Sequence, residues 1–385
     1  MDNSNSSGVP EDNCATSLLD RGIGRNCSSY EEENINLDAG YKVRFIYAAV
    51  GSVGILGNAI VIGVIVTSLS MRKATTNILI ANQSAIDFSA SLFIVLTTYI
   101  REVDAVRGVL GKELFCRLWA DNFPIWSLFV SSTYNLVCIT MERYVGIVHP
   151  IRHGRMCTRG RAAYVLAFAW LTGLAYNLSY MVPTSPYKEG HCTAYSEWPS
   201  LFVQRAVGLL TIAVQFVMPM ILIAFAYARI VVTLRRGGPL SADRRRQNAD
   251  PVYFRREERM KRARVNVVKT LVLVSLSFVL CWAPNQIYYT MYNLGFGTDF
   301  NGTFYHFTVI AVFLNCCINP VIYSFQYEQF KVEMFRFCRR STEVADVSLP
   351  EATRQARHRK AVYVIETDRC AGRCNDAFHN EQTHL

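Results

Sequence analysis

The sequence predicts an all-α membrane protein, a seven-transmembrane helix bundle followed by a short amphipathic eighth helix. Seven mostly apolar stretches are each long enough to cross a bilayer, hydrophobic residues make up 51% of the chain, and Lys and Arg gather in alternate connections. A helix rises about 1.5 Å per residue, so a hydrocarbon core of about 30 Å needs about 20 residues. Backbone polar groups in lipid must be satisfied within the segment, which favours helix for every stretch.

The seven predicted spans are separated by connections and flanked by two polar ends. The spans cover residues 43–67, 76–100, 114–148, 162–183, 200–233, 265–294 and 304–325. We therefore expect an extracellular tail over residues 1–40, a seven-helix domain with its eighth helix over 41–340, and a cytoplasmic tail over 341–385. Both tails lack sustained helical periodicity, so we expect them to be flexible.

The distribution of Lys and Arg predicts which end of the bundle faces the cytosol. If residue 1 lies outside the cell, the three inner connections hold 17 Lys and Arg, and the three outer ones hold 4. Positive residues mark cytoplasmic loops, so we expect a multi-pass plasma-membrane protein with an extracellular N-terminus. The glycosylation acceptors Asn5, Asn26 and Asn301 fall on the outer side of this topology.

An amphipathic segment follows the seventh span. Over residues 327–340, Phe and Met are interspersed with Lys and Arg at helical spacing. This pattern predicts a short helix that lies on the inner leaflet of the bilayer. Cys338 near its end is a candidate for palmitoylation, which would add a second membrane signal; the alternative is a free cysteine.

Composition argues against several other classes of protein. The formal net charge of +10 comes largely from the inner loops, so we expect the lipid bilayer and no nucleic acid as a partner. The sequence shows no metal-ligand cluster, nucleophile with its base, or internal repeat, which argues against an enzyme and a transporter. Cys14, Cys27, Cys116 and Cys192 lie on the outer side, where disulfides persist.

Polar residues at mid-membrane depth are costly to bury and therefore indicate functional sites. Asp87 is a carboxylate near the centre of a predicted span, and Asn58, Ser132, Asn315 and Asn319 lie at comparable depths on other spans. A lone carboxylate among neutral oxygen donors can hold a monovalent cation or share a proton. The alternative is a hydrogen-bonded core residue.

Charged residues and prolines predict a switch. Arg143 ends the third span beside Glu142, whose carboxylate would hold the guanidinium and release it when a partner enters from the cytosol. The alternative, a static surface pair, would contribute only about 0 to 1 kcal/mol. Pro219, Pro284 and Pro320 each remove a helix hydrogen bond inside a span, which predicts a bundle that can bend.

Each of the seven spans contains a short sequence motif or a characteristic residue. In order along the chain, these are Gly57-Asn58, Asp87, Glu142-Arg143-Tyr144, Trp170, Pro219 with Tyr227, Phe278 with Cys281-Trp282 and Pro284, and Asn319-Pro320-Val321-Ile322-Tyr323, followed by Phe330. This set resembles the rhodopsin-like (class A) family of G-protein-coupled receptors. The resemblance covers about residues 41–340 and is nearest to neuropeptide-receptor-like or orphan members.

The resemblance implies roles for the matching residues. A sodium ion, as an allosteric ligand, would be held by Asp87, Asn58, Ser132, Asn315 and Asn319, and no other cofactor is expected. The activation switch would comprise Glu142, Arg143, Tyr144, Tyr227, Phe278, Trp282, Pro284, Asn319, Pro320 and Tyr323. Its rearrangement would admit a heterotrimeric G protein, with arrestin as a second candidate partner. Cys116 and Cys192 match the family's disulfide between the third span and the second outer loop.

The outer half of the bundle carries the candidate ligand site. Amphipathic aromatic residues lie there beneath acidic outer loops, which suits a basic or amidated peptide. The candidate ligand-binding residues are Asp121, Ile125, Trp126, Gln215, Asn285, Gln286 and Tyr289. The alternative is that these aromatic residues belong to an ordinary core and membrane interface.

Departures from the family pattern bear on this site. Ile125 takes the position where amine receptors resemble one another in carrying Asp, and Asp121 one turn away is a partial substitute. Phe313 replaces the retinal-binding Lys of opsins, which argues against light sensing. The distance from Cys116 to Arg143 is two residues longer than usual, which predicts a bulge in the third span and leaves the direction of Ile125 open.

We therefore expect a receptor, not an enzyme, that transmits binding of an extracellular ligand to heterotrimeric G proteins. A short peptide is the favoured ligand. A receptor for a small amine or lipid, and a ligand-independent orphan receptor of the same fold, are the alternatives.

Overall fold

The seven-helix fold is present in the computed structural model of the 385-residue chain, which describes residues 27–100, 105–193, 195–235, 251–300 and 302–348. Within these ranges, seven spans are long and apolar enough to cross a membrane: Gly40–Thr67, Thr75–Tyr99, Val109–Val148, Gly160–Thr184, Leu201–Arg235, Val265–Leu294 and Thr303–Gln326. Each begins and ends within about five residues of its predicted bounds, so the predicted fold class is confirmed.

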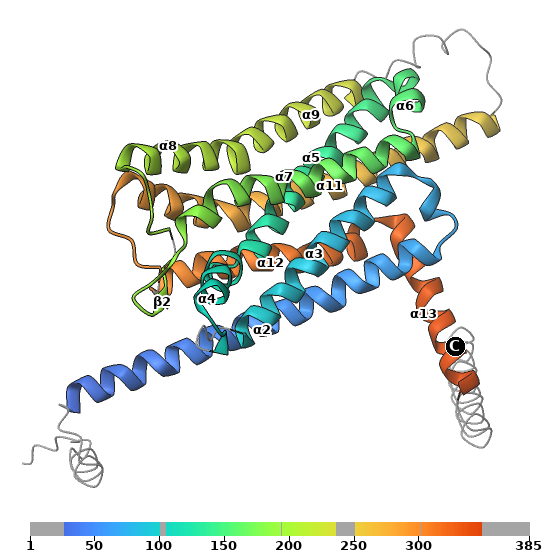
Figure 1. Ribbon diagram of the computed structural model, residues 1–385. Coiled ribbons are helices and arrows are strands. Elements are labelled where there is room, and N and C mark those ends of the chain that lie inside the picture. Colours follow the sequence, from blue (N-terminus) through green and yellow to red (C-terminus); the bar gives the residue numbers. More distant parts are fainter. Residues whose placement is uncertain (1–26, 101–104, 194, 236–250, 301, 349–385) are drawn as a thin grey trace, which may run out of the picture. The chain divides into compact units, whose positions relative to one another are not determined.

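Figure 1 shows the helices that build the spans, and the third and fifth spans also contain a π-helix each. Their elements are α2 (Cys27–Thr67), α3 (Thr75–Tyr99), α4 (Val109–Phe115), the π-helix η3 (Cys116–Ala120), α5 (Phe123–Val148), α7 (Arg159–Thr184), α8 (Leu201–Ile212), the π-helix η4 (Ala213–Val217), α9 (Met218–Arg235), α11 (Pro251–Leu294) and α12 (Thr303–Gln326). Two short connecting helices are η1 (Met71–Lys73) and α6 (Pro150–Met156).

The first helix begins earlier than the sequence predicts. It starts at Cys27, inside the segment that we expected to lack helix up to residue 40. That part of the prediction is wrong. Once the apolar span has nucleated the helix, each further residue adds one hydrogen bond, so the helix can extend toward the N-terminus. Residues 1–26 lie outside the described part of the chain.

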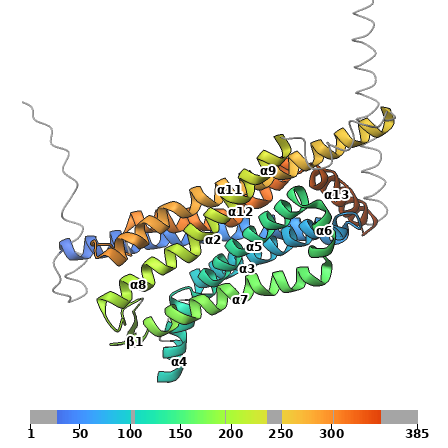
Figure 2. The same cartoon turned by 90° about the horizontal axis from the view of Figure 1, so that it is seen from above.

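The third span lies at the centre of the bundle. Its helix α5 contacts α3, α7 and α9, while α2 contacts α3 and α12, and α11 contacts α12 and α8 (Figures 1 and 2). In the most apolar window of this span 78% of residues are buried, against 22% to 50% in the other six spans. Residues on several faces of α5 are therefore in contact with neighbouring helices.

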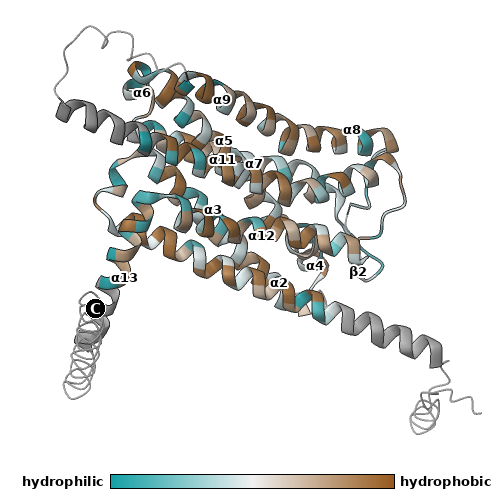
Figure 3. Ribbon diagram, turned by 180° about the vertical axis from the view of Figure 1, so that it is seen from behind, coloured by the Kyte–Doolittle hydropathy of each residue, from teal (hydrophilic) through white to brown (hydrophobic). Residues whose placement is uncertain are grey.

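The surface of the bundle is apolar and its interior contains buried polar groups. Large apolar side chains such as Phe45, Leu56, Leu280 and Phe325 are exposed on the outer faces of their helices. The hydropathy colouring in Figure 3 shows apolar segments along the length of the spans. Lipid can cover this apolar surface, and the buried polar residues can bond to one another across helices.

The third span contains the predicted bulge. The π-helix η3 is followed by Asn122 in the left-handed region, with φ of 57°, before α5 begins at Phe123. A π-helical turn takes up an additional residue, so η3 and the break after it can accommodate the extra length. A second π-helix, η4, ends two residues before Pro219, whose missing N–H removes a helix hydrogen bond at this place.

The connection between α7 and α8 contains a hairpin that the sequence does not predict. Strands β1 (Tyr187–Lys188) and β2 (His191–Cys192) are antiparallel, with Tyr187 opposite Cys192. Glu189 and Gly190 between them have φ of 50° and 87°. Positive φ at both turn residues is the type I′ geometry that matches the twist of a hairpin.

The eighth helix, α13 (Glu328–Ser348), belongs to a separate compact unit that starts at Glu328. It is longer than the predicted segment, which ends at residue 340. Ion pairs three residues apart, Lys331–Glu328 at 3.2 Å and Arg336–Glu333 at 2.8 Å, lie along it. Such pairs stabilise the first turns of this helix, within the predicted segment.

Candidate functional site

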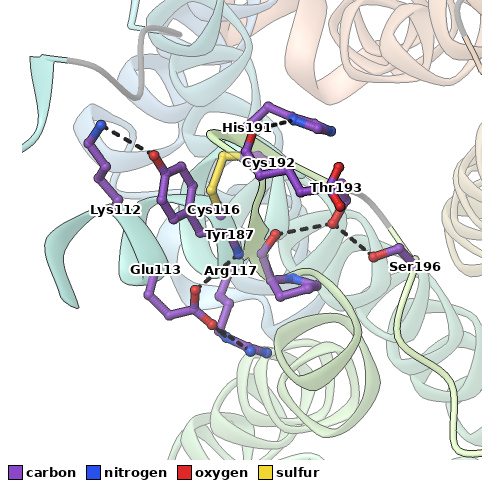
Figure 4. Close-up of a disulfide and its surroundings, with 11 residues drawn as sticks. Lys112, Glu113, Cys116, Arg117, Tyr187, His191, Cys192, Thr193 and Ser196 are labelled. Atoms are coloured by element: carbon purple, nitrogen blue, oxygen red, sulfur yellow. Dashed lines mark hydrogen bonds and ion pairs between the residues drawn. A yellow bond between two sulfur atoms is a disulfide. The ribbon is translucent and has the colours of Figure 1, made fainter. Parts of the chain in front are cut away.

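A disulfide ties the hairpin to the third span. Cys116 on η3 and Cys192 on β2 are bonded, with their Cα atoms 5.1 Å apart, which is the pairing that the resemblance implies. Glu113 on α4 accepts hydrogen bonds from Arg117 at 2.7 Å and from the backbone N–H of Tyr187 at 3.0 Å (Figure 4). We call the end of the bundle that carries this hairpin the outer end, and the end that carries Arg143 the inner end.

A cavity of about 470 Å³ lies at the outer end, between α2, α3, the third span and α12, beside β2. We call it the outer cavity. Its aromatic wall includes Tyr47, Trp119, Trp126 and Tyr305. The hydroxyl of Tyr47 lies 2.9 Å from Nδ1 of His306, which joins α2 to α12 at the edge of the cavity. A volume of this size is within the range of ligand-binding pockets.

Asp121 is the acidic residue in the wall of the outer cavity. It lies at the break between η3 and α5, so the bulge determines where its side chain points. Ser185 donates a hydrogen bond to the carboxylate, but the buried Oδ2 atom has no hydrogen-bond partner among the described residues. A buried, incompletely paired carboxylate is costly, and a cationic ligand group would offset that cost.

A second, smaller cavity of about 40 Å³ lies toward the fifth and sixth spans. Trp126 and Tyr305 line both cavities, so the two are adjacent. In the wall of the small cavity, Nε2 of Gln215 and Oε1 of Gln286 have no hydrogen-bond partner within the described part of the chain. These atoms are available to the polar groups of a ligand.

Tyr195 closes the small cavity from the second outer loop. Its ring is stacked on Tyr180 at 6.5 Å and meets Tyr289 edge-on at 6.3 Å. Burial, and then the neighbouring Tyr180 and Tyr289, hold the pKa of Tyr195 well above its ordinary value. The phenol therefore stays neutral and remains a hydrogen-bond donor.

The structure divides the predicted ligand residues between the two cavities. Asp121 and Ile125 line the outer cavity, while Gln215, Asn285, Gln286 and Tyr289 line the small one, and Trp126 lines both. The sequence missed Tyr47, Trp119, Tyr195 and Tyr305. No motif or spacing marks these residues, because they meet only when the first, third and seventh spans and the outer loop come together.

Aromatic contacts lead from the cavities into the core. Trp126 meets Trp282 at a centroid distance of 6.5 Å, and Phe129 meets Trp282 at 5.7 Å. Phe278 lies 5.5 Å from Trp282, one turn deeper on α11. Trp282 and Phe278 are almost completely buried. A ligand that moves Trp126 would therefore press on Trp282, which lies two positions before Pro284 inside α11.

Asp87 lies in a buried network in the middle of the bundle. Its carboxylate accepts hydrogen bonds from Asn319 at 2.8 Å, from Ser132 at 3.0 Å and from the Gln83 amide at 3.3 Å. Gln83 also contacts the hydroxyl of Ser132. Its own Oε1 accepts a hydrogen bond of 2.8 Å from Asn135, so its amide nitrogen is directed toward Asp87. Gln83 and Asn135 are the members of this network that the sequence missed.

The other two residues of the predicted sodium set lie less directly against Asp87. Asn58 donates to the carbonyl oxygen of Cys316 at 2.9 Å, and its buried Oδ1 has no hydrogen-bond partner among the described residues. Asn315 is buried on α12. The carboxylate, hydroxyl and amide oxygens present here are the ligand types that a hard cation prefers, so the residues fit a sodium ion. The Gln83 amide competes with such an ion for the same carboxylate.

At the inner end, Arg143 is paired with its neighbour on α5. Its Nε and one terminal nitrogen donate to the two carboxylate oxygens of Glu142 at 2.6 and 2.7 Å. Thr76 on α3 donates to the same carboxylate at 2.7 Å. Glu142 is buried, so this pair is stronger than an exposed one.

The remaining switch residues connect neighbouring spans at the inner end. Tyr227 on α9 lies 3.4 Å from the hydroxyl of Thr140 and 3.3 Å from that of Ser275, and so bridges α5 and α11. Tyr323 is fully buried on α12, where Pro320 follows Asn319. The Tyr144 hydroxyl lies 3.4 Å from His149.

Several predicted modification sites are not part of this geometry. Asn5, Asn26 and Asn301 lie outside the described residues, as does Cys14. Cys338 on α13 is exposed and is not part of a disulfide.

Comparison with known proteins identifies the family. A family model described as 7 transmembrane receptor (rhodopsin family) matches residues 57–323. Somatostatin receptor type 4 of Rattus norvegicus is 28% identical over 299 residues, which cover 75% of this chain and 70% of the relative. Somatostatin receptor type 3 of Homo sapiens is 28% identical over 298 residues, which cover 76% and 67% of the two chains.

The fold comparison agrees. The crystal structure of squid rhodopsin aligns with a TM-score of 0.63 over 78% of this chain and 85% of that one, at 21% identity. Members of the matched family are membrane receptors rather than enzymes, and respond to an extracellular signal through G proteins. The chain therefore belongs to the rhodopsin family of seven-transmembrane receptors.

Proposed function

We propose that this receptor responds to a short extracellular peptide that carries a basic group, and that the group binds Asp121 in the outer cavity. The single observation that carries the proposal is the buried Oδ2 of Asp121, which has no hydrogen-bond partner among the described residues and lies in an aromatic cavity of about 470 Å³. Aromatic faces attract cations, and a carboxylate supplies the charged hydrogen bond. The relatives named as somatostatin receptors support a ligand of the peptide class.

Signal transmission follows from the contacts between the cavities and the core. A peptide in both cavities would touch Trp126, which lies against Trp282, and a shift there would favour a state with α11 bent outward at Pro284. Arg143 would then leave Glu142 and admit the G protein. A ligand can shift two states only by its differential affinity, about 5.5 kcal/mol for a reversal from 1:99 to 99:1.

The substitution Asp121→Asn tests whether this carboxylate binds the basic group of the peptide. A library of short peptides is screened on cells that express the receptor, and each active peptide is compared with its analogue in which Lys is replaced by neutral norleucine. We expect Asp121→Asn to lower the potency of the basic peptide about 10- to 100-fold, because hydrogen bonds to charged groups contribute about 1.5 to 3 kcal/mol. The neutral analogue should lose little.

Glu197→Gln is the matched control, since Glu197 is a partly exposed outer-loop acid paired with Lys188 at 2.6 Å. It should leave potency nearly unchanged, as exposed ion pairs contribute about 0 to 1 kcal/mol. Equal potency of the basic peptide on both variants would place the cation elsewhere. Activity of a small amine or lipid, with every peptide silent, would support the alternative ligand class instead.

We further propose that Asp87, Ser132 and Asn319 hold a sodium ion, with Asn58 and Asn315 beside them. The ion would supply the positive charge that this buried carboxylate lacks. We expect the purified receptor to unfold at a higher temperature in NaCl than in KCl of equal ionic strength, and Asp87→Asn to remove the difference. Gln83→Leu should enlarge it, because the competing amide is gone. A salt difference that survives in Asp87→Asn would rule out this site.

We also propose the membrane orientation, the covalent modifications and a second cytosolic partner of this receptor. The N-terminus faces outward, supported by the excess of Lys and Arg in the inner loops, and Asn5, Asn26 and Asn301 are glycosylated there. Cys338, exposed on an amphipathic helix, is palmitoylated at the inner leaflet of the plasma membrane, and arrestin is a second partner of the inner end.

A further inference from the structure

Three potential metal ligands meet at the inner end of α5. Among the residues that the structure describes, Glu142, His153 and Cys157 bring a carboxylate oxygen, an imidazole nitrogen and a thiol sulfur within 4.8 Å of one another. The Nε2 of His153 lies 2.8 Å from Oε1 of Glu142. The sequence predicts no such cluster, because the ligands belong to two helices and a loop that meet only when α6 folds against α5 (Figures 1 and 2).

Local helix geometry places two of the ligands together. His153 is on α6 and Cys157 follows it, and the N–H of Cys157 donates to the carbonyl oxygen of His153 at 2.8 Å. Residues four apart in a helical turn lie on one face, so the imidazole and the thiol can reach the same point. On α5, Gly146 lies one turn beyond Glu142, and a Cβ added there would be 3.2 Å from Cδ2 of His153. The glycine leaves room for the imidazole ring.

Further hydrogen bonds orient the cluster from α3. Thr76 donates to Oε2 of Glu142 at 2.7 Å, which leaves Oε1 directed toward His153. Thr75 donates to the carbonyl oxygen of Cys157 at 3.1 Å and holds the end of the loop. Such outer hydrogen bonds are a regular feature of metal sites, because they fix the direction of the ligands.

The chemistry of this donor set selects a metal. Nitrogen and sulfur ligands disfavour Mg²⁺ and Ca²⁺, which take oxygen, and favour a borderline ion such as Zn²⁺. His153 has 31% of its side chain exposed, whereas Glu142 has 5%, so the ion can enter past the imidazole. We propose that Glu142, His153 and Cys157 bind a zinc ion through Oε1, Nε2 and Sγ, with water at a fourth position.

A zinc ion at this place would compete with Arg143. One terminal nitrogen of Arg143 donates to Oε1 of Glu142 at 2.7 Å, the atom that the metal would take. The ion would also repel the guanidinium. A cysteine binds zinc as its thiolate, so binding displaces a proton from Cys157. Zinc would thereby loosen the ion pair between Glu142 and Arg143. The extracellular peptide is proposed to open the same pair from the outer end, so this consequence rests on the proposed function.

The first experiment measures binding alone, on the purified full-length receptor. Zinc is titrated against a chromophoric chelator, and cobalt(II) is used to detect the charge-transfer band of a metal–thiolate bond. We expect His153→Ala and Cys157→Ser each to lose one equivalent of bound metal, and Cys157→Ser to lose the cobalt band. Thr76→Val, which removes a hydrogen bond to a ligand, should lower zinc affinity about 10- to 100-fold.

His149→Ala is the matched control, because His149 lies on the same connection but faces Tyr144. It should bind zinc as the unaltered receptor does. Unfolding temperatures measured without metal show whether each variant is folded. If folded His153→Ala and Cys157→Ser variants take up as much metal as the unaltered receptor, the zinc lies elsewhere and the proposed site is wrong.

The second experiment separates the site from the proposed function. Basal nucleotide exchange on added G protein is measured in inside-out membranes, with zinc or with a chelator. We expect zinc to raise exchange in the unaltered receptor and in His149→Ala, and to have no effect in Cys157→Ser. Zinc that binds without changing exchange would overturn the link to Arg143. A receptor that activates no G protein under any condition would count against the proposed function, while the binding experiment still decides the site.

Discussion

Arg143→Ala is expected to abolish G-protein activation while the receptor still reaches the cell surface. In this structure Arg143 is held by both carboxylate oxygens of Glu142, at 2.6 and 2.7 Å, and Glu142 is held in turn by Thr76. The guanidinium is therefore bound to Glu142 at the inner end, and it can contact a G protein only when this ion pair opens. Surface labelling and nucleotide exchange on added G protein, with and without an active peptide, measure the two properties separately.

The matched control is Arg152→Ala, which removes an exposed Arg from α6 on the same end of the bundle. It should signal nearly normally, since exposed charges away from a site change little. Glu142→Gln should raise basal nucleotide exchange, because the neutral amide holds Arg143 less strongly than the carboxylate does. Normal signalling by Arg143→Ala at normal surface density would refute the proposed switch.

Breaking the disulfide is expected to have the second large effect. Cys116→Ser, Cys192→Ser and the double variant should each lose response to the peptide and unfold more easily, by about 2 to 5 kcal/mol. The bond joins residues 76 positions apart, so its loss frees a long loop in the unfolded chain and releases β2 from the wall of the outer cavity. Thermal unfolding of the purified receptor and peptide dose–response curves check both parts.

The hairpin has further attachments that limit the damage. Lys112 donates to the hydroxyl of Tyr187 at 3.3 Å, and Glu113 accepts from the backbone N–H of Tyr187 at 3.0 Å (Figure 4). The double variant should therefore still fold, and Glu113→Gln in its background should lower stability further. Cys338→Ser, which removes an exposed thiol, is the control and should leave stability unchanged. Full peptide response in the double variant would show that the disulfide does not hold the ligand site in place.

Some features of the inner and outer ends could be read from residue counting. The two extra residues between Cys116 and Arg143 predict a bulge, and the structure has η3 and the left-handed Asn122 there. The adjacency of Glu142 and Arg143 along the chain predicts their contact. The first prediction compares a residue count with the usual spacing of the family, and the second concerns neighbours in the chain, so neither needs knowledge of how the other helices pack.

The contacts between helices could not be predicted from residue spacing. No motif distinguishes Gln83 from the other polar residues of the second span. Only the packing of α3 against α5 directs its amide toward Asp87, with Asn135 fixing its orientation. The hairpin strands are two residues long, too short for an alternating pattern. His153 and Cys157 lie beside Glu142 because the short helix α6 folds against the end of α5.

The sequence by itself determined the seven spans, and with them the fold class. A segment in lipid must satisfy its own backbone, so its boundaries depend on local hydropathy alone. Tertiary structure decided how the ligand residues divide between two cavities, which groups surround Asp87, and what lies against Glu142. Those outcomes depend on the rotation and packing of whole helices against one another, and a change in either would bring different side chains to the same place.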